Sequence, residues 1–140
     1  MKPSVIALFL LICCAFTGTD RPLTIEQILA NPEQYNGKTV HVTGYFTQEL
    51  EKRAIYQSKN DAKISNYKAS LWLADYTNLI QFLTKWGNTA DEPFLANKYV
   101  VVTGKLNYKP DTINGKVYGH GPENLWPAEL VEISHIQEAK

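Results

Sequence analysis

Two segments of the chain carry the same alternating pattern, and this repeat is the strongest constraint on the fold. Residues 36–44 and 96–104 share the spacing Lys-x-Val-x-Val-Thr-Gly. A period of two is typical of a β-strand with one buried face. The glycine that ends each copy is typical of a bulge or a sharp bend. The pattern therefore predicts two strands that curve in the same way. The valines expected to face the core are Val40, Val42, Val100 and Val102.

The rest of the chain predicts three more strands and a few short helices. The additional strands are expected at residues 54–56, 69–73 and 130–136. Thr24 is expected to cap a helix that runs through Leu29, and Ser58 to cap a single helical turn. Residues 77–86 have apolar side chains at helical spacing. The chain is therefore expected to be mainly β with short helices, as a five-stranded, partly open barrel of the OB type with a helix between strands three and four.

Several stretches of the sequence also resemble a group of small exported bacterial proteins of unknown function with an OB-like fold. These stretches are residues 40–46, 49–51, 54–56, 58–62 and 71–73, together with Gly119-His120-Gly121. The resemblance covers roughly residues 23–136 and implies the fold, but it implies no reaction. The chain departs from the group in a longer segment at about residues 75–97.

The N-terminus has the features of a secretory signal peptide. Lys2 precedes an apolar run at residues 5–16, and small residues follow up to Thr19. The run is shorter than the roughly 20 apolar residues that span a bilayer. A buried N-terminal helix or strand would also explain the run, but not its position at the very start. We expect a signal peptide at residues 1–19, an OB-like domain at residues 20–140, and a location in the periplasm or cell envelope.

Both cysteines lie inside this predicted signal, and two interpretations of them stay open. Cys13 and Cys14 are either apolar residues that cleavage discards, or part of a degenerate lipobox that leaves Cys14 as a lipidated N-terminus. A typical lipobox has Gly, Ala or Ser just before its cysteine, where this sequence has Cys13. Either way, we expect no disulfide and no thiol chemistry in the folded domain.

The charge of the mature domain argues against general nucleic-acid binding. Loss of Lys2 with the signal leaves 13 of the 14 basic residues against 14 acidic ones. A protein that binds nucleic acid through phosphates needs an excess of Lys and Arg.

The three histidines form no pattern of metal ligands. His41 and His135 are expected at the surface of strands, and no two histidines have ligand spacing. No metal and no cofactor are therefore expected. His120 differs because glycines flank it within the long connection at residues 107–128, and glycines allow a close approach to a ligand. The simpler alternative is a tight turn with an incidental histidine.

Two carboxylates near the end of the first strand are the only hint of catalysis. Glu49 and Glu51 would share a face if the strand continued, and paired carboxylates can transfer protons. Lys52 and Arg53 follow at once, so a charged hairpin tip is the preferred interpretation. Because no nucleophile elbow and no phosphate-binding loop occur either, we expect no enzyme.

Aromatic and basic residues are the stronger lead. Seven rings are spread over the usual binding face of an OB fold, and they either stack on a ligand or fill the core. Trp72 lies between two leucines, so one side of this triplet must be exposed or covered by a loop. The rings are Tyr45, Tyr56, Tyr67, Trp72, Tyr108, Tyr118 and Trp126. A basic excess along the second strand and its flanks indicates a solvated face or a groove for an anion. Its members are Lys52, Arg53, Lys59, Lys63 and Lys68.

These observations favour an exported OB-like binding or interaction module whose partner is an envelope protein or a small anionic ligand. The binding residues are then expected on one connected surface. The candidates are Tyr56, Trp72, His120, Lys52, Arg53, Lys59, Lys63 and Lys68. A single-stranded nucleic-acid-binding protein is the alternative, and a carboxylate-dependent hydrolase is the least favoured.

Overall fold

The chain is mainly β in the computed structural model. The described residues are 21–49, 52–74, 95–109 and 112–140. The predicted signal peptide with Cys14, the residue Glu51 and the predicted helix at residues 77–86 lie outside this part of the chain. None of the helices in the described part is long and apolar enough to cross a membrane.

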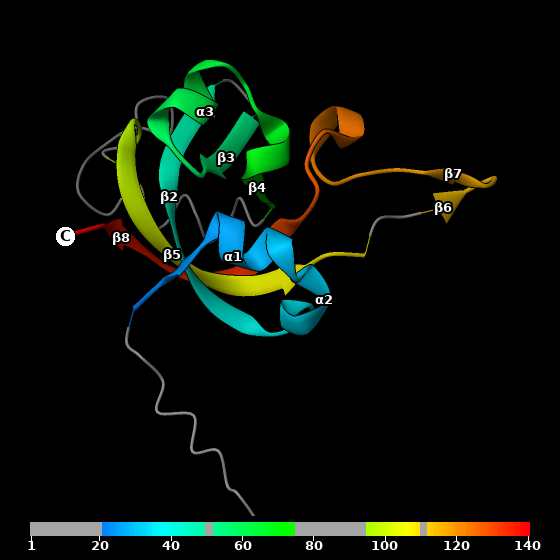
Figure 1. Ribbon diagram of the computed structural model, residues 1–140, viewed down its shortest axis with the longest axis horizontal. Helices are drawn as coiled ribbons and strands as arrows, with labels where there is room; N and C mark the ends of the chain where they lie inside the picture. The colour runs from blue at the N-terminus through cyan, green and yellow to red at the C-terminus, as the bar shows by residue number, and fades with distance from the viewer. Residues whose placement is uncertain (1–20, 50–51, 75–94, 110–111) are drawn as a thin grey trace, which may run out of the picture.

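Five strands form a sheet whose pairing returns to its starting strand (Figure 1). The strands are β2 (Thr39–Glu49), β3 (Lys52–Tyr56), β4 (Ser70–Leu73), β8 (Glu129–Glu138) and β5 (Lys98–Asn107), in the order of their pairing. Strand β5 pairs again with β2, and β4 runs parallel to β8 while the other pairs in this ring are antiparallel. The short strand β1 (Leu23–Thr24) adds to β2 in parallel. The five predicted strands are therefore confirmed. Four have somewhat longer bounds, and β4 begins one residue later than predicted.

The two copies of the repeated sequence pattern pair with each other as β2 and β5, and their pairing has a local two-fold symmetry. Val42 lies opposite Val102, its equivalent in the other copy. The two glycines follow the same symmetry: Gly44 of β2 pairs with Val100 of β5, and Gly104 of β5 pairs with Val40 of β2. All four valines are buried as predicted. The repeated pattern is thus that of two neighbouring strands that present the same residues to one core.

A short helix and a close backbone contact complete this core. Thr24 caps helix α1 (Ile25–Ala30) in a capping box with Gln27, as its position predicted, and the short helix α2 (Pro32–Tyr35) follows. Ile25 and Ile28 are fully buried in the same cluster as the strand valines. A Cβ at Gly44 would lie 2.9 Å from the Cβ of Ile55 and 3.0 Å from the Cδ1 of Ile25. Only glycine therefore lets β3 and α1 pack this closely on β2.

Strand β8 departs from the predicted alternation. Its buried residues are Leu130, Ile133 and Ile136, so the spacing is three rather than two. Glu132 has a φ of 47°, and the register with β5 shifts between Thr103 and Lys105. A β-bulge of this kind inserts extra residues on one strand and turns the following side chains to the other face.

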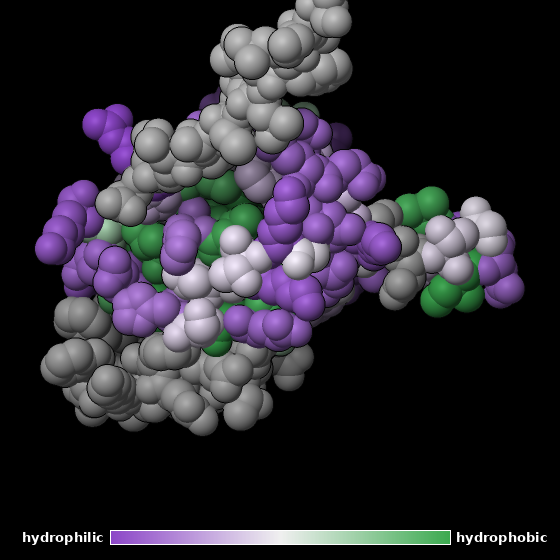
Figure 2. Space-filling view, turned by 90° about the horizontal axis from the view of Figure 1, so that it is seen from below, coloured by the Kyte–Doolittle hydropathy of each residue, from purple (hydrophilic) through white to green (hydrophobic). Residues whose placement is uncertain are grey.

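The connection at residues 107–128 carries structure of its own. Strands β6 (Thr112–Ile113) and β7 (Lys116–Val117) form a hairpin that extends away from the sheet (Figure 1). Figure 2 shows apolar side chains on this hairpin, where Ile113 and Val117 are more than half exposed. The chain then returns to the sheet through the 3₁₀ turn η2 (Pro122–Asn124).

Two further short elements lie between β3 and β4. Helix α3 (Lys59–Lys63) is capped by the Ser58 hydroxyl, which accepts a hydrogen bond from the Asp61 amide as predicted. The 3₁₀ turn η1 (Tyr67–Ala69) leads into β4.

The register of β5 can be tested with a matched pair of variants. Val102→Asp should lower the free energy of unfolding by about 4 kcal/mol, because it places an unpaired charge in the core. Val101→Asp should cost about 1 kcal/mol or less, because its side chain points away from the core. Urea unfolding of both variants measures the difference, and equal losses would show that the proposed register is wrong.

Candidate functional site

A second apolar cluster lies on the outer face of β3 and β4. Alternation sends Ile55 and Leu71 into the main core, while Tyr56 and Trp72 point to the other side of the sheet. These two rings are only 5% and 7% exposed. Of the two alternatives for these rings, stacking on a ligand or packing inside the protein, the structure therefore has the second for Tyr56 and Trp72.

The rings are covered by residues 119–126, which we call the cover segment. Trp126 is buried, with its ring centroid 4.8 Å from that of Trp72 and 5.0 Å from that of Tyr67. Of the two states open to the Trp72 triplet, exposed or covered by a loop, the structure has the second. The chain's own tryptophan occupies the place that a stacked ligand would take.

The glycines that flank His120 serve this contact with Trp126. Gly121 has a φ of +69°, and a Cβ there would lie 2.6 Å from the Trp126 ring and 3.0 Å from the Trp72 ring. A Cβ at Gly119 would lie 2.5 Å from the carbonyl oxygen of Asn124. The predicted close approach is therefore present, but its target is another part of the chain.

His120 holds the cover segment in place through its backbone and its side chain. Its backbone exchanges two hydrogen bonds with Trp126, of 2.9 and 3.2 Å. Its Nδ1 lies 3.4 Å from Oε1 of Glu129, which also accepts a 2.7 Å hydrogen bond from the Asn107 amide. The hydrogen bond from His120 holds the pKa of Glu129 below its usual value against the opposing effect of burial, with help from Asn107. His120 is 7% exposed, so its side chain stabilises the cover segment and is not accessible to a bound ligand.

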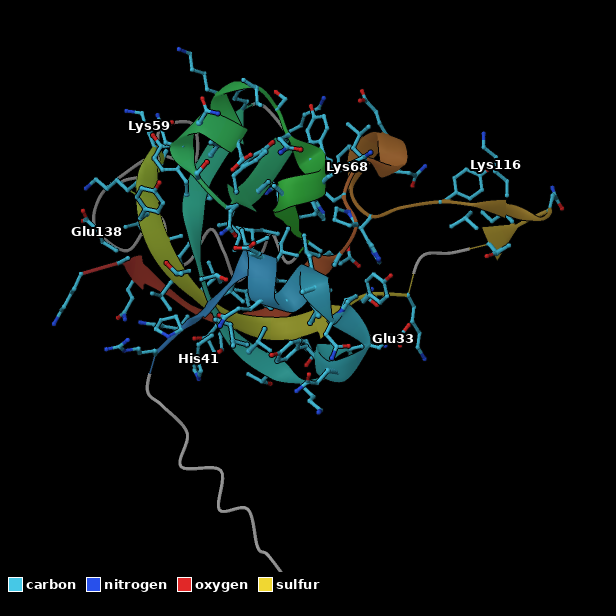
Figure 3. The ribbon with its side chains drawn as sticks, in the orientation of Figure 1. Glu33, His41, Lys59, Lys68, Lys116 and Glu138 are labelled. Carbon is cyan, nitrogen blue, oxygen red and sulfur yellow. The ribbon has the colours of Figure 1, made fainter. Side chains whose placement is uncertain are left out.

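The predicted basic residues do not form one groove. Lys52 lies 3.5 Å from Glu123 of the cover segment, and Arg53 lies 5.6 Å over the Trp72 ring. Lys59 and Lys68 are exposed on opposite flanks of the α3–η1 region (Figure 3). Lys63 is exposed at the end of α3.

Lys59 and Lys68 also have different neighbours. The Lys59 backbone amide donates to the Tyr99 hydroxyl of β5. Lys68 instead borders a shallow hollow of about 440 Å³ beside α1, together with Glu26 and Asp61. Lys52 and Arg53 therefore lie near the covered rings, whereas α3 and η1 turn the other lysines in different directions.

A small polar pocket of about 30 Å³ lies beside the covered rings, on the outer face of the β2–β3 hairpin. Alternation brings Thr47 and Glu49 of β2 to this face, opposite Ala54 and Lys52 of β3. The segment after α3 closes the other side. The lining residues are Thr47, Glu49, Lys52, Ala54, Tyr56, Ala62, Ser65 and Tyr67.

Two hydroxyl groups in this pocket have no hydrogen-bond partner among the residues that the structure describes. Within the described part of the chain, the hydroxyls of Tyr56 and Tyr67 make no hydrogen bond, although Tyr56 is 5% exposed. Burial raises the pKa of Tyr56 to about 12, helped by Tyr67 and by the charge of Glu49. The Tyr56 hydroxyl therefore keeps its proton at neutral pH and is a donor.

Sequence reasoning named Tyr56, Lys52 and Glu49 but not the pocket that joins them. Thr47 could have been added, since it shares its strand face with Glu49 at a spacing of two. Ser65 carries no such signal, because its place depends on how the chain leaves α3, where its φ is 52°.

The other histidines lie elsewhere. His41 and His135 are exposed on β2 and β8, and Nδ1 of His41 lies 2.8 Å from the Thr103 hydroxyl. No three His, Cys, Asp or Glu side chains gather as metal ligands among the residues that the structure describes.

The packing of the cover segment predicts a large penalty for a side chain at Gly121. Gly121→Ala should lower the free energy of unfolding by about 3 kcal/mol, from the strained positive φ and from overpacking against two tryptophan rings. Gly115→Ala is the matched control, because Gly115 has a φ of +76° and a Cβ added there would have no atom within 4 Å. It should cost about 1 kcal/mol. Similar losses for the two variants in urea would contradict the packing described for Gly121.

The hydrogen bonds to Glu129 predict a loss of stability in acid. Because its pKa is lower in the folded chain than its ordinary value of 4.5, Glu129 contributes stability above that pH. The contribution should disappear as the pH falls through the folded pKa. Glu129→Gln should therefore flatten the stability profile below about pH 4.5, as chemical unfolding at a series of pH values would show. An unchanged slope would mean that the His120–Glu129 contact does not act in solution.

No family model, curated protein or solved structure matches the chain. The resemblance to small exported OB-like proteins therefore stays a prediction. Function has to be argued from the polar pocket and from the covered rings beside it.

Proposed function

We propose that this chain is an exported binding module with an OB-type fold, and that its ligand or envelope partner contacts the outer face of β2, β3 and β4. The order of pairing supports the fold. Numbered along the chain, the five ring strands pair as first, second, third, fifth, fourth and first again, with the third and fifth parallel. A five-stranded Greek-key sheet of the OB type binds its ligands on the face of its second and third strands, here β3 and β4.

One observation carries the proposal of a binding site. The polar pocket on this face is lined by Tyr56, a residue only 5% exposed whose hydroxyl makes no hydrogen bond within the described part of the chain. A hydrogen bond from such a hydroxyl contributes about 0.5–1.5 kcal/mol. A bound group that accepts a hydrogen bond from Tyr56 would gain that contribution, and this favours the pocket as the point of recognition.

The covered rings weigh against single-stranded nucleic acid as the ligand. Non-specific binding of single strands uses exposed rings on which the bases stack. Here Tyr56 and Trp72 are buried, and Trp126 lies on the face of Trp72. The distribution of Lys59 and Lys68 over two flanks also provides no continuous track for a phosphate backbone.

The pocket also favours binding over hydrolysis. A general base works best with a pKa near the operating pH. Burial moves the pKa of Tyr56 away from that range, to about 12. Of the two carboxylates that the hydrolase hypothesis needs, Glu49 borders the pocket and Glu51 lies outside the described residues.

Removal of one hydroxyl tests the proposed site. The ¹⁵N-labelled protein is titrated separately with monosaccharides, inorganic phosphate and a short oligothymidylate, and the amide shifts of Ser65 and Tyr67 are followed. At least one probe should shift them, and Tyr56→Phe should weaken its binding about tenfold by removing one hydrogen bond.

Tyr99→Phe is the matched control, because it removes a hydroxyl that bonds the Lys59 amide outside the pocket. It should leave the affinity unchanged. The proposal fails if every probe that binds shifts only other surfaces. Binding of oligothymidylate that falls steeply with salt would instead support the nucleic-acid alternative.

A further inference from the structure

The polar pocket is lined mainly by neutral hydrogen-bonding groups. Four of its eight lining residues carry hydroxyls, two are alanines, and one carboxylate and one ammonium complete the set. Hydroxyls both donate and accept, whereas the Glu49 carboxylate only accepts and the Lys52 ammonium only donates. Such a lining can satisfy a bound group that needs a donor and an acceptor at the same time.

The charges at the pocket disfavour an anion. Glu49 acts on the Tyr56 hydroxyl through its negative charge, so its field reaches into the pocket. The one cation in the lining, Lys52, lies 3.5 Å from the Glu123 carboxylate, which offsets its charge. A phosphate or carboxylate would thus meet a like charge without a free cation to balance it.

The volume of the pocket limits what can enter. About 30 Å³ is far smaller than the roughly 150 Å³ of a cavity that holds a benzene ring. A single hydroxyl or hydroxymethyl group fits, but a sugar ring or a nucleobase does not. The rest of such a ligand must lie outside, against the exposed rim at Ser65 and Glu49.

The walls of the pocket are held in place before any ligand arrives. The Asp61 carboxylate binds the Ser58 hydroxyl at 2.5 Å and the Asn66 side-chain amide at 2.8 Å, which fixes the chain on either side of Ser65. These hydrogen bonds also lower the pKa of Asp61, so it is charged at neutral pH. On the other wall, Tyr67 packs edge-on against Trp126. A preformed site loses less conformational freedom when it binds.

We propose that the pocket receives a single hydroxyl or hydroxymethyl group of a neutral carbohydrate. This inference rests on the proposed function and narrows it, because it selects an uncharged sugar over the small anionic ligand expected from the sequence. In this arrangement Tyr56 donates to the sugar oxygen, and the Glu49 carboxylate accepts from the sugar hydroxyl. The cover segment remains closed over Trp72.

The test compares charged and neutral forms of the same sugar. Glucose, glucose 6-phosphate, inorganic phosphate and 2-deoxyglucose are each titrated into the ¹⁵N-labelled protein. Glucose should shift the amides of Ser65 and Tyr67, and Tyr56→Phe should raise its Kd about tenfold. Inorganic phosphate should leave these amides unshifted.

Glu49→Gln separates the charge from the shape of the pocket. This variant should raise the Kd for glucose about fivefold, because a neutral amide oxygen accepts a weaker hydrogen bond than the carboxylate does. If phosphate alone shifts Ser65 and Tyr67, the carbohydrate inference fails while the proposed binding site survives. If neither sugar nor phosphate shifts them at tens of millimolar, the carbohydrate inference fails. If ligands bind only elsewhere on the protein, both the inference and the site are wrong.

Discussion

The contact of β2 with β5 is the constraint on which the rest of the structure depends. Val42 faces Val102 at its centre, and the two copies of one sequence pattern lie antiparallel around this pair. Because this contact returns the sheet to its first strand, every strand gains an inner and an outer side. The absence of a side chain at Gly44 lets α1 and β3 pack against the same point of β2.

Closure of the sheet creates a second packing problem on its outer face. Tyr56 and Trp72 alternate with core residues, so they must point away from the core, where they would expose large rings to water. The cover segment removes them from solvent with Trp126 and is held there by the contact of His120 with Glu129. The polar pocket beside it then remains as a place on this face where hydroxyls converge without partners in the described chain. The same packing that hides the rings thus leaves the pocket as the candidate point of recognition.

Local patterns predicted the elements, and tertiary contacts decided what those elements expose. The strands, the Thr24 cap and the Ser58 cap follow from periodicity and from side-chain hydrogen bonds within four residues, which a sequence records directly. The burial of Trp72 depends on a segment some 50 residues away in the sequence. Alternation could therefore predict on which face of the sheet Trp72 lies, but not that Trp126 covers it. The bulge at Glu132 escaped prediction because a charged residue gives no sign that it adopts a positive φ.

The central claim is that recognition uses the polar pocket while Trp126 stays over Trp72. A high-resolution crystal structure of the protein soaked in glucose tests this most directly, because it locates the sugar and the cover segment together. The account predicts a sugar hydroxyl within hydrogen-bond distance of the Tyr56 hydroxyl, with the Trp126 ring still in contact with Trp72. A sugar stacked on Trp72 with Trp126 displaced, or a pocket in which Tyr56 bonds only to the protein, would contradict it.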